Sequence, residues 1–345
     1  MNNAKLFIKR SVKSAAAFAG RAAGFHQAKP DSVNIIAYHR VVADIAKAER
    51  EAIYGLVVSS TTFRRHCRLL NKFYDVVSLE TAAHFLDDEQ KRKTSRPLAV
   101  ITFDDGYLDF YEEAFPILNE FGLSATVFLP TEFIGQSRPL AHDRLYWLVK
   151  QASEKSVPVS SALEKAGLSK EFVEKFAGES NILKSTDLLV HLPDEIREKV
   201  IFQLEQKLAD KFENYPSEYQ LLDWETVREM QRKGINFGGH TASHVVLPLE
   251  DCSVMEKELV ASKNELETQL NEEISSFAYP NGEYNEQIKK LVAQAGYKIA
   301  VTTEKRINRP AADLLALGRI SLCEESTRGF GGVYSSPVAN LRLGI

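Results

Sequence analysis

The chain contains few cysteines, no long apolar run and no marked excess of charge of either sign. Its 345 residues include only Cys67, Cys252 and Cys323, whose wide separation excludes the close spacing of a zinc finger or a redox pair. Scattered thiols are typical of a reducing compartment, which favours a cytoplasmic protein. No apolar stretch approaches the ~20 residues that span a bilayer. The formal net charge of -4 gives no sign of a nucleic-acid partner.

The first 30 residues interleave basic and apolar side chains. Residues 14–20 are too weakly apolar for the core of a secretory signal, which needs about 7–15 apolar residues, although secretion stays open. Two interpretations remain: a basic amphipathic helix on an anionic membrane, peripheral on its inner face, and a surface helix docked on the protein body. The basic residues are Lys5, Lys9, Arg10, Lys13 and Arg21, and the apolar ones are Leu6, Phe7, Ile8, Val12, Phe18 and Phe25.

Two polar clusters come directly after short apolar runs that are typical of buried strands. Asp104 and Asp105 follow residues 98–101, and His240 and His244 follow residues 235–237. Adjacent carboxylates at the end of a buried strand are costly unless a cation compensates them. One carboxylate with two imidazoles is a ligand set for a divalent metal with open positions, and the other carboxylate is then free to act as a general base.

Each cluster also has a structural interpretation. An Asp-Asp-Gly turn alone is typical of a helix N-cap, and two histidines can come together by chance. The joint presence of both clusters favours the metal site, for which Zn²⁺ is the best match and Co²⁺ or Ni²⁺ are alternatives. The i, i+4 spacing predicts that the rings of His240 and His244 share one face of a helical turn, and Gly238-Gly239 would allow a sharp turn before them.

Strand-like and helix-like segments alternate along most of the chain. This alternation predicts an α/β fold, an irregular (β/α) barrel of about seven or eight strands over residues 31–330, with catalytic groups at the carboxyl ends of the strands. The alternation breaks over about 151–219, which we interpret as a helical insertion, and residues 331–345 form a tail. Strands are predicted over 33–38, 75–79, 98–101, 125–129, 235–238, 275–279, 297–303 and 316–322, and helices from about 60 and over about 80–86, 111–121, 195–212, 225–233, 253–270 and 286–294.

Three motifs occur in an order and spacing that resembles the polysaccharide deacetylase family, carbohydrate esterase family four. They are T-F-D-D-G at 102–106, H-T-A-S-H at 240–244 and F-A-Y-P-N-G at 277–282. Y-H-R-V at 38–41, D-R-L at 143–145 and Trp224 match its bacterial branch. The resemblance runs from about residue 33 to 322. It implies an irregular (β/α) barrel and metal-dependent hydrolysis of an acetyl group, usually the N-acetyl of an amino sugar.

The resemblance also implies roles for individual residues. Asp104 resembles the general base, and the metal ligands would be Asp105, His240 and His244. The loop that lines the substrate groove, in which a backbone amide usually helps to hold the oxyanion, would be Tyr279, Pro280, Asn281 and Gly282.

Two features of many family members are missing here. The arginine that orients the base shortly before the Pro-containing loop is replaced by Ser275 and Ser276, and the late strand at 317–322 lacks the histidine that acts as general acid. We hypothesise that Arg319 replaces the orienting arginine and that His39, at the end of the first strand, protonates the leaving amine.

The sequence therefore predicts a metal-dependent hydrolase that acts on an acetylated glycan, a bacterial cell-surface polysaccharide or its lipid-linked precursor. Two alternatives stay open: a catalytically silent sugar-binding or scaffold protein on the same barrel, and a metal hydrolase acting on another C–N bond. Further sugar-binding candidates are Tyr107, Asp143 and Arg319, although core packing of the tyrosine and helix capping by the aspartate are common. Trp224 could also stack on a sugar, and His142 is expected to be exposed.

Overall fold

A parallel β-sheet that is nearly closed into a barrel forms the centre of the molecule. The computed structural model describes residues 9–17, 29–87 and 95–345. The barrel strands are β1 (Val33–Tyr38), β4 (Asp75–Val76), β5 (Leu98–Phe103), β6 (Thr126–Leu129), β7 (Asn236–Gly239), β8 (Ser276–Ala278), β9 (Ile299–Val301) and β10 (Arg319–Ser321). Their order is β10-β1-β5-β6-β7-β8-β9, with short β4 beside the start of β5. A parallel bridge between Val301 and Leu317 narrows the remaining gap.

Alternate side chains of each strand enter two different apolar layers, because the sheet is covered on both faces. Ile35 of β1 and Val100 of β5 pack inside the barrel in one cluster with Phe128. Their neighbours Ile36 and Ile101 pack outward in a second cluster that includes the surrounding helices. Along β5, the side chains of residues 98 and 100 point into the barrel. The same alternation points residues 102 and 104 inward, at the carboxyl end of the strand.

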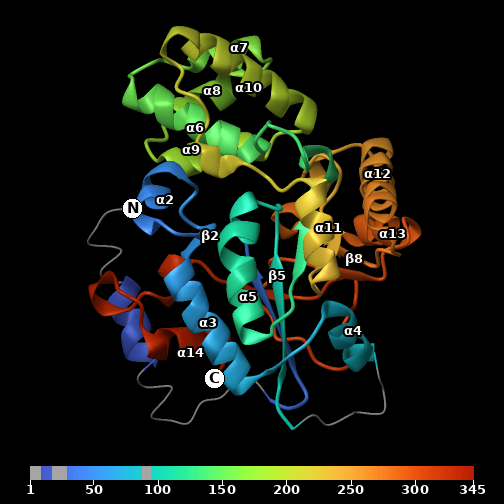
Figure 1. Cartoon of the computed structure of the whole chain (residues 1–345). Coiled ribbons are helices and arrows are strands. Elements are labelled where there is room, and N and C mark those ends of the chain that lie inside the picture. Colours follow the sequence, from blue (N-terminus) through green and yellow to red (C-terminus); the bar gives the residue numbers. More distant parts are fainter. Residues whose placement is uncertain (1–8, 18–28, 88–94) are drawn as a thin grey trace.

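Helices surround the barrel, as Figure 1 shows. Ser59 caps α3 by accepting a hydrogen bond from the Thr62 N–H, and Gly122 ends α5 in the left-handed region with φ 63°. A π-helical turn, η1 (Phe110–Ala114), leads into α5, and a small two-stranded sheet pairs β2 (Arg40–Val42) with β3 (Val57–Ser59). The surrounding helices are α2 (Ile45–Glu51), α3 (Ser60–Phe73), α4 (Leu79–Asp87), α5 (Phe115–Phe121), α11 (Trp224–Arg232), α12 (Cys252–Leu270), α13 (Glu286–Gln294) and α14 (Ser336–Leu343). The predicted fold class, an irregular (β/α) barrel, is confirmed.

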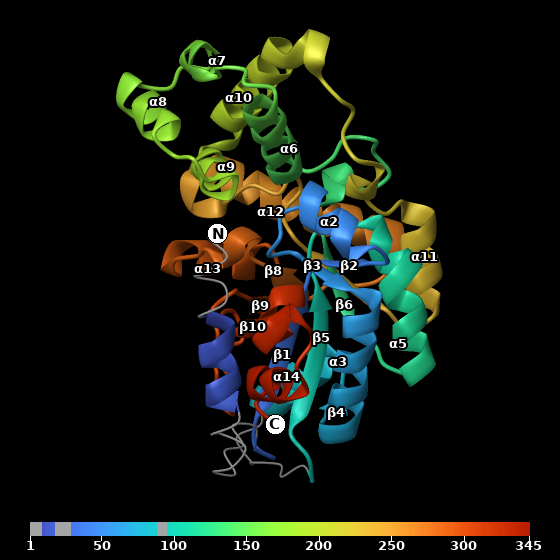
Figure 2. The ribbon, with the colours of Figure 1, turned by 90° about the vertical axis from the view of Figure 1, so that its left-hand side faces the viewer.

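A group of five helices lies at one end of the molecule, at the top of both Figure 1 and Figure 2. It comprises α6 (Ala141–Glu154), α7 (Ser160–Lys165), α8 (Lys170–Ala177), α9 (Ile182–Val190) and α10 (Asp194–Leu208). Leu145, Leu163 and Leu204 belong to an apolar cluster that this group builds for itself. The group begins at α6, before the stretch at 151–219 in which the sequence pattern loses its strands.

A helix over residues 9–17 docks on the C-terminal segment. The Arg10 guanidinium pairs with Glu325 at 2.6 Å, and the Lys13 ammonium donates to the Glu325 carbonyl at 3.2 Å. Burial lowers the pKa of Lys13. These contacts agree with the interpretation of this segment as a surface helix docked on the protein body. Lys9 and Val12 also lie on this helix, and Val12 is 63% exposed, whereas the rest of the basic and apolar pattern, such as Lys5 and Phe18, lies outside the described residues. Among the described helices, none combines the length and the apolar character needed to cross a bilayer.

Candidate active site

Asp104 is held by an arginine from the last strand of the barrel. Arg319 donates two parallel hydrogen bonds, from Nη1 to Oδ1 at 2.7 Å and from Nη2 to Oδ2 at 2.6 Å. The Arg319 Nη1 also donates to the Thr102 hydroxyl, and its Nε donates to the Thr302 carbonyl. Burial alone would raise the pKa of Asp104, but the guanidinium more than offsets this and lowers it. Asp104 is therefore an ionised carboxylate with a fixed orientation.

Arg319 lies where we expect a residue that replaces the missing orienting arginine. Its side chain is fully buried, and it does not line the cavity above the site. The expectation that it binds sugar directly does not fit this position, because the guanidinium is buried behind Asp104 and bound to it.

Asp105 points away from Asp104 toward two histidines. Its φ of 75° lies in the left-handed region, which non-glycine residues rarely adopt, and this backbone turn separates the two carboxylates. One ligand atom each from Asp105, His240 and His244 lie within 4.8 Å of one another. The Asp105 Oδ1 is 3.4 Å from the His240 Nε2 and 3.1 Å from the His244 Nε2.

The tautomer of His240 shows what this cluster needs. Its Nδ1 lies 2.7 Å from the Ala278 carbonyl oxygen, which can only accept, so Nδ1 carries the proton. In the neutral ring, Nε2 then presents a lone pair to the Asp105 Oδ1, a buried atom that accepts no hydrogen bond. Two facing lone pairs repel each other unless a proton or a metal cation lies between them. The donor set therefore fits a divalent metal ion.

The two histidines lie on a loop, and the predicted helical turn is wrong. Thr241 and His244 have φ values of 60° and 58°, which interrupt any helix. Glu258 of α12 holds the loop instead, because its Oε2 accepts from the backbone N–H groups of residues 242 and 243 at 2.9 and 2.8 Å, and its Oε1 accepts from the Ser243 hydroxyl. Spacing of i, i+4 brings the rings together here without helical geometry.

The glycine pair before this loop serves close packing, and not the sharp turn that the sequence suggested. Both glycines lie within β7. A Cβ on Gly238 would lie 2.7 Å from the Phe128 ring, and one on Gly239 would overlap the Tyr297 hydroxyl. Only a residue without a side chain lets β7 fit between these rings.

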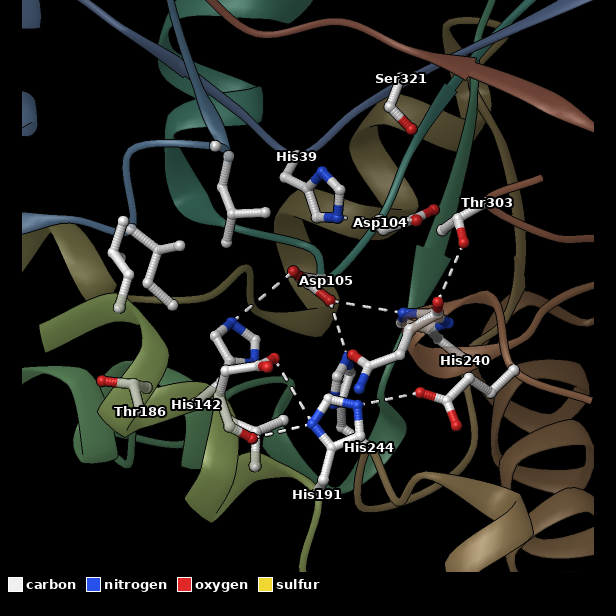
Figure 3. A pocket seen from close by; sticks show the side chains of 18 of the residues that line it. His39, Asp104, Asp105, His142, Thr186, His191, His240, His244, Thr303 and Ser321 are labelled. Carbon is white, nitrogen blue, oxygen red and sulfur yellow. Dashed lines mark hydrogen bonds and ion pairs between the residues drawn. The ribbon is translucent and has the colours of Figure 1, made fainter. Parts of the chain in front are cut away.

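A cavity of about 700 Å³ opens over the site, and Figure 3 shows the side chains that line it. His39 enters this cavity, with its Nε2 at 3.8 Å from the Asp104 Oδ2 and its side chain 22% exposed. Asn281 also lines the cavity. The position of His39, next to the candidate base and open to the cavity, is the one that a proton donor would need.

Most of the other expected sugar-binding residues do not reach the cavity. Tyr279 is buried, and its hydroxyl donates to the Leu315 carbonyl at 2.9 Å. Tyr107 and Asp143 are buried against each other through a 2.7 Å hydrogen bond. The remaining residues that are absent from the cavity lining are Pro280, Gly282 and Trp224.

The match to a known family decides the identity of this barrel. The family model described as polysaccharide deacetylase matches residues 91–161 and 190–300, more than half of the chain. The chain belongs to the polysaccharide deacetylase family. This confirms the resemblance and identifies a carbohydrate deacetylase of the hydrolase class.

Similar proteins agree with this assignment. The YxkH protein of Bacillus subtilis (strain 168), which is named for the same family, is 21% identical over 307 residues, covering 89% of this chain and 77% of its own. The structure of the Streptococcus pyogenes deacetylase PplD in complex with acetate has a TM-score of 0.56 at 21% identity, covering 86% of this chain and 94% of that one. IcaB from Ammonifex degensii has a TM-score of 0.55 at 16% identity with the same coverage. These structures share the deacetylase barrel.

One histidine near the polysaccharide deacetylase motifs was expected at the surface and is not there. His142 of α6 is 11% exposed and lies 3.9 Å from Asp105, and its ring centroid is 5.2 Å from that of His244. The Tyr107 hydroxyl contacts its Nε2 at 2.8 Å. Burial lowers the pKa of His142 to about 3, so its ring is neutral. The only signal in the sequence was its place directly before the D-R-L motif.

Helix α9 was also missed as part of this deacetylase site. Leu183, Thr186, Asp187 and Val190 line the cavity, as does His191 at the end of the helix. The family match leaves out residues 162–189, which contain nearly all of α9. A segment beyond the matched family core therefore contributes one wall of the cavity.

Proposed function

We propose that this deacetylase is metal-dependent and removes the N-acetyl group from an amino-sugar unit of a bacterial cell-surface polysaccharide or its lipid-linked precursor. The observation that supports it best is the convergence of Asp105, His240 and His244 beside a carboxylate that Arg319 keeps ionised. Separate groups are thus available for metal binding and for proton transfer.

The three ligand residues would hold one divalent ion. Two imidazoles and one carboxylate suit Zn²⁺ best, with Co²⁺ and Ni²⁺ as alternatives. When bound, the ion supplies Lewis-acid chemistry that activates water and polarises the acetyl carbonyl. The fixed tautomer of His240 and the buried, unpaired oxygen of Asp105 supply the electron pairs for that ion.

The remaining side chains would move the protons of the reaction. Asp104 takes a proton from the water that attacks the acetyl carbonyl carbon, and Arg319 keeps the carboxylate aimed and ionised. His39 gives a proton to the amide nitrogen as the C–N bond breaks, so acetate and a free amino sugar leave. The attacked carbon and the leaving nitrogen are bonded to each other, and the 3.8 Å between His39 and Asp104 supports joint action of these two groups on them.

The two adjacent aspartates provide the sharpest test, because each serves as the matched control for the other. Asp105→Ala should lose metal, since the variant lacks the only anionic ligand. Asp104→Asn should keep metal and fold, and its turnover should fall by about 10²-fold or more with substrate binding largely retained. Metal content by elemental analysis, and acetate release from short N-acetyl sugars, measure both effects.

The same experiment separates the alternatives. Loss of metal from Asp104→Asn instead of Asp105→Ala would contradict the proposed roles. A metal-loaded wild-type protein that binds acetylated sugars and releases no acetate would favour the silent scaffold. Hydrolysis of cyclic amides in place of N-acetyl sugars would favour action on another C–N bond.

A further inference from the structure

The cavity over the site has two chemically different sides. The side formed by the strand ends is polar and contains both aspartates and three histidines of the site. The other side contains the aliphatic residues Ile53 and Leu56 from the segment between α2 and β3, and Leu183 and Val190 from α9, whose Lys184, Thr186 and Asp187 also line the cavity. Such a division suits a ligand that is itself polar at one end and apolar at the other.

Part of the aliphatic side takes no part in core packing, whereas Val190 packs against the apolar cluster of the five helices. Ile53, Leu56 and Leu183 belong to none of the apolar clusters formed by the described residues. Leu183 is 41% exposed, although its helix has a buried face of its own through Leu189. Aliphatic side chains left open around a cavity gain free energy only when a ligand covers them.

The lining also lacks the aromatic side chains on which the further sugar rings of a glycan chain would stack. Among the described residues, no tyrosine, tryptophan or phenylalanine lines the cavity. Aromatic side chains offer the broad flat surfaces on which sugar rings stack, and they add a polar handle. A volume of about 700 Å³ lies within the ~300–1,000 Å³ that holds a drug-sized ligand, so space remains beside one sugar.

Contacts across the cavity hold α9 in place. The His191 Nε2 lies 3.1 Å from the Glu283 carboxylate, which follows η6 (Pro280–Gly282) on the opposite wall. The His191 Nδ1 lies 2.8 Å from the Asp187 carbonyl, which fixes the ring. Asn181 caps the helix at its other end by accepting from the Lys184 N–H. The aliphatic wall is therefore formed before any ligand binds.

We propose that the substrate is an acetylated amino sugar that carries an aliphatic chain, a glycolipid-type molecule. The sugar lies against Asp104, Asp105 and the histidines, and the chain lies between Ile53 and Leu56 on one side and Leu183 and Val190 on the other. This inference rests on the proposed deacetylase function and names its substrate class. Residues 162–189, outside the family match, supply Leu183 and so adapt the site to that substrate.

A chain-length series tests the proposal. Methyl, butyl, hexyl and octyl N-acetylglucosaminides are assayed for acetate release with the full-length, metal-loaded protein, below their micelle-forming concentrations. Burial of a methylene group contributes up to ~0.8 kcal/mol, so KM should fall by about twofold to fourfold for each of the first added methylenes. The turnover number should change little, because the chain lies away from the reacting carbon.

Substitutions on the aliphatic wall should remove this dependence. Leu183→Ser and Ile53→Ser should each flatten the KM series, so that the octyl glycoside loses its advantage over the methyl glycoside. Val260→Ser is the matched control, because Val260 is 45% exposed on α12 and does not line the cavity. That variant should keep the full chain-length dependence.

Calorimetric titration of the Asp104→Asn protein with the same glycosides gives a readout that needs no turnover. Affinity that rises with chain length in this protein, and is lost in Leu183→Ser/Asp104→Asn, supports the inference even if no acetate is released. Acetate release with no dependence of KM on chain length overturns the inference and leaves the proposed function standing. Equal affinity for the methyl and octyl glycosides overturns it as well.

Discussion

Replacement of Arg319 by methionine should destabilise the protein and disable its base together. Methionine keeps much of the volume of the side chain and removes the guanidinium that forms two hydrogen bonds with Asp104 at 2.7 and 2.6 Å. Asp104 is 3% exposed, so water would compensate only in part for the lost partner. We expect the Arg319→Met protein to fold with its carboxylate unpaired.

The size of the effect follows from burial of both partners. Removal of one member of a buried ion pair costs about 3–5 kcal/mol of unfolding free energy, because the other charge is left uncompensated. Burial then raises the pKa of Asp104, since the group that lowered it is gone. In the wild type, the pair contributes stability above the unfolded aspartate pKa of about 3.9 and loses it as the pH falls through the lower folded value. The difference between the two proteins should therefore shrink in acid.

Urea unfolding at several pH values measures this difference, and three further variants control it. Arg319→Lys keeps the charge but not the two parallel hydrogen bonds, so it should lose less stability. Asp104→Asn and the Arg319→Met/Asp104→Asn double variant complete a cycle. The double variant should be more stable than the sum of the single changes predicts, by about 2–3 kcal/mol, because it contains no unpaired charge.

The activity of Arg319→Met provides a second readout. The acidic limb of its kcat/KM profile should move to higher pH, since a proton must now be removed from a base with a raised pKa. An additive cycle, together with an unchanged acidic limb, would refute the argument that Arg319 keeps Asp104 ionised.

Three other predictions concern the core and the proton donor. His66 is buried between the Tyr38 and Thr327 hydroxyls with its pKa lowered to about 3, so the unfolded state binds the extra proton and stability falls as the pH drops below about 6.5. This group alone should cost about 2 kcal/mol between about pH 7.5 and 5, and His66→Gln should remove that part of the pH dependence in urea unfolding. Gly239→Ala should lower the unfolding free energy by about 1–3 kcal/mol, because the added Cβ overlaps Tyr297. Gly55→Ala is the control and should have little effect, because the space around its Cβ is open. Equal stabilities of the two variants would contradict this prediction. His39→Ala should reduce kcat by about 10²–10⁴-fold with unchanged thermal unfolding, and normal turnover would exclude it as the acid.

Much of the barrel and the site could be predicted because the relevant signals are local in sequence. Alternating strands and helices predict the fold, and polar residues that follow apolar runs lie at the carboxyl ends of strands. Asp104, Asp105, His240 and His244 therefore line one cavity, and the last three lie within reach of one another. The pairing of Arg319 with Asp104 could be hypothesised only because the usual arginine was missing.

The remaining features depend on contacts between distant segments. Spacing of i, i+4 does not distinguish a helix from a loop held by Glu258, and a glycine pair does not show which rings approach it. Nothing near His142 in sequence shows that α6 turns its ring toward Asp105. Helix α9 forms a wall of a cavity that it shares with strand ends far from it in the sequence. The cellular location and the membrane association of the first 30 residues stay predictions.

Because Asp104 pairs with Arg319, the candidate base is completed only late in the synthesis of the protein. The strand that precedes Asp104 is synthesised early, His240 and His244 follow, and Arg319 leaves the ribosome near the end. Until then a growing chain contains all three candidate metal ligands, while the carboxylate beside them has no partner that could keep it charged in a buried position. Barrel closure by β10 thus completes the fold and the candidate base in one event. A chain that stops short of that strand should be left without deacetylase activity.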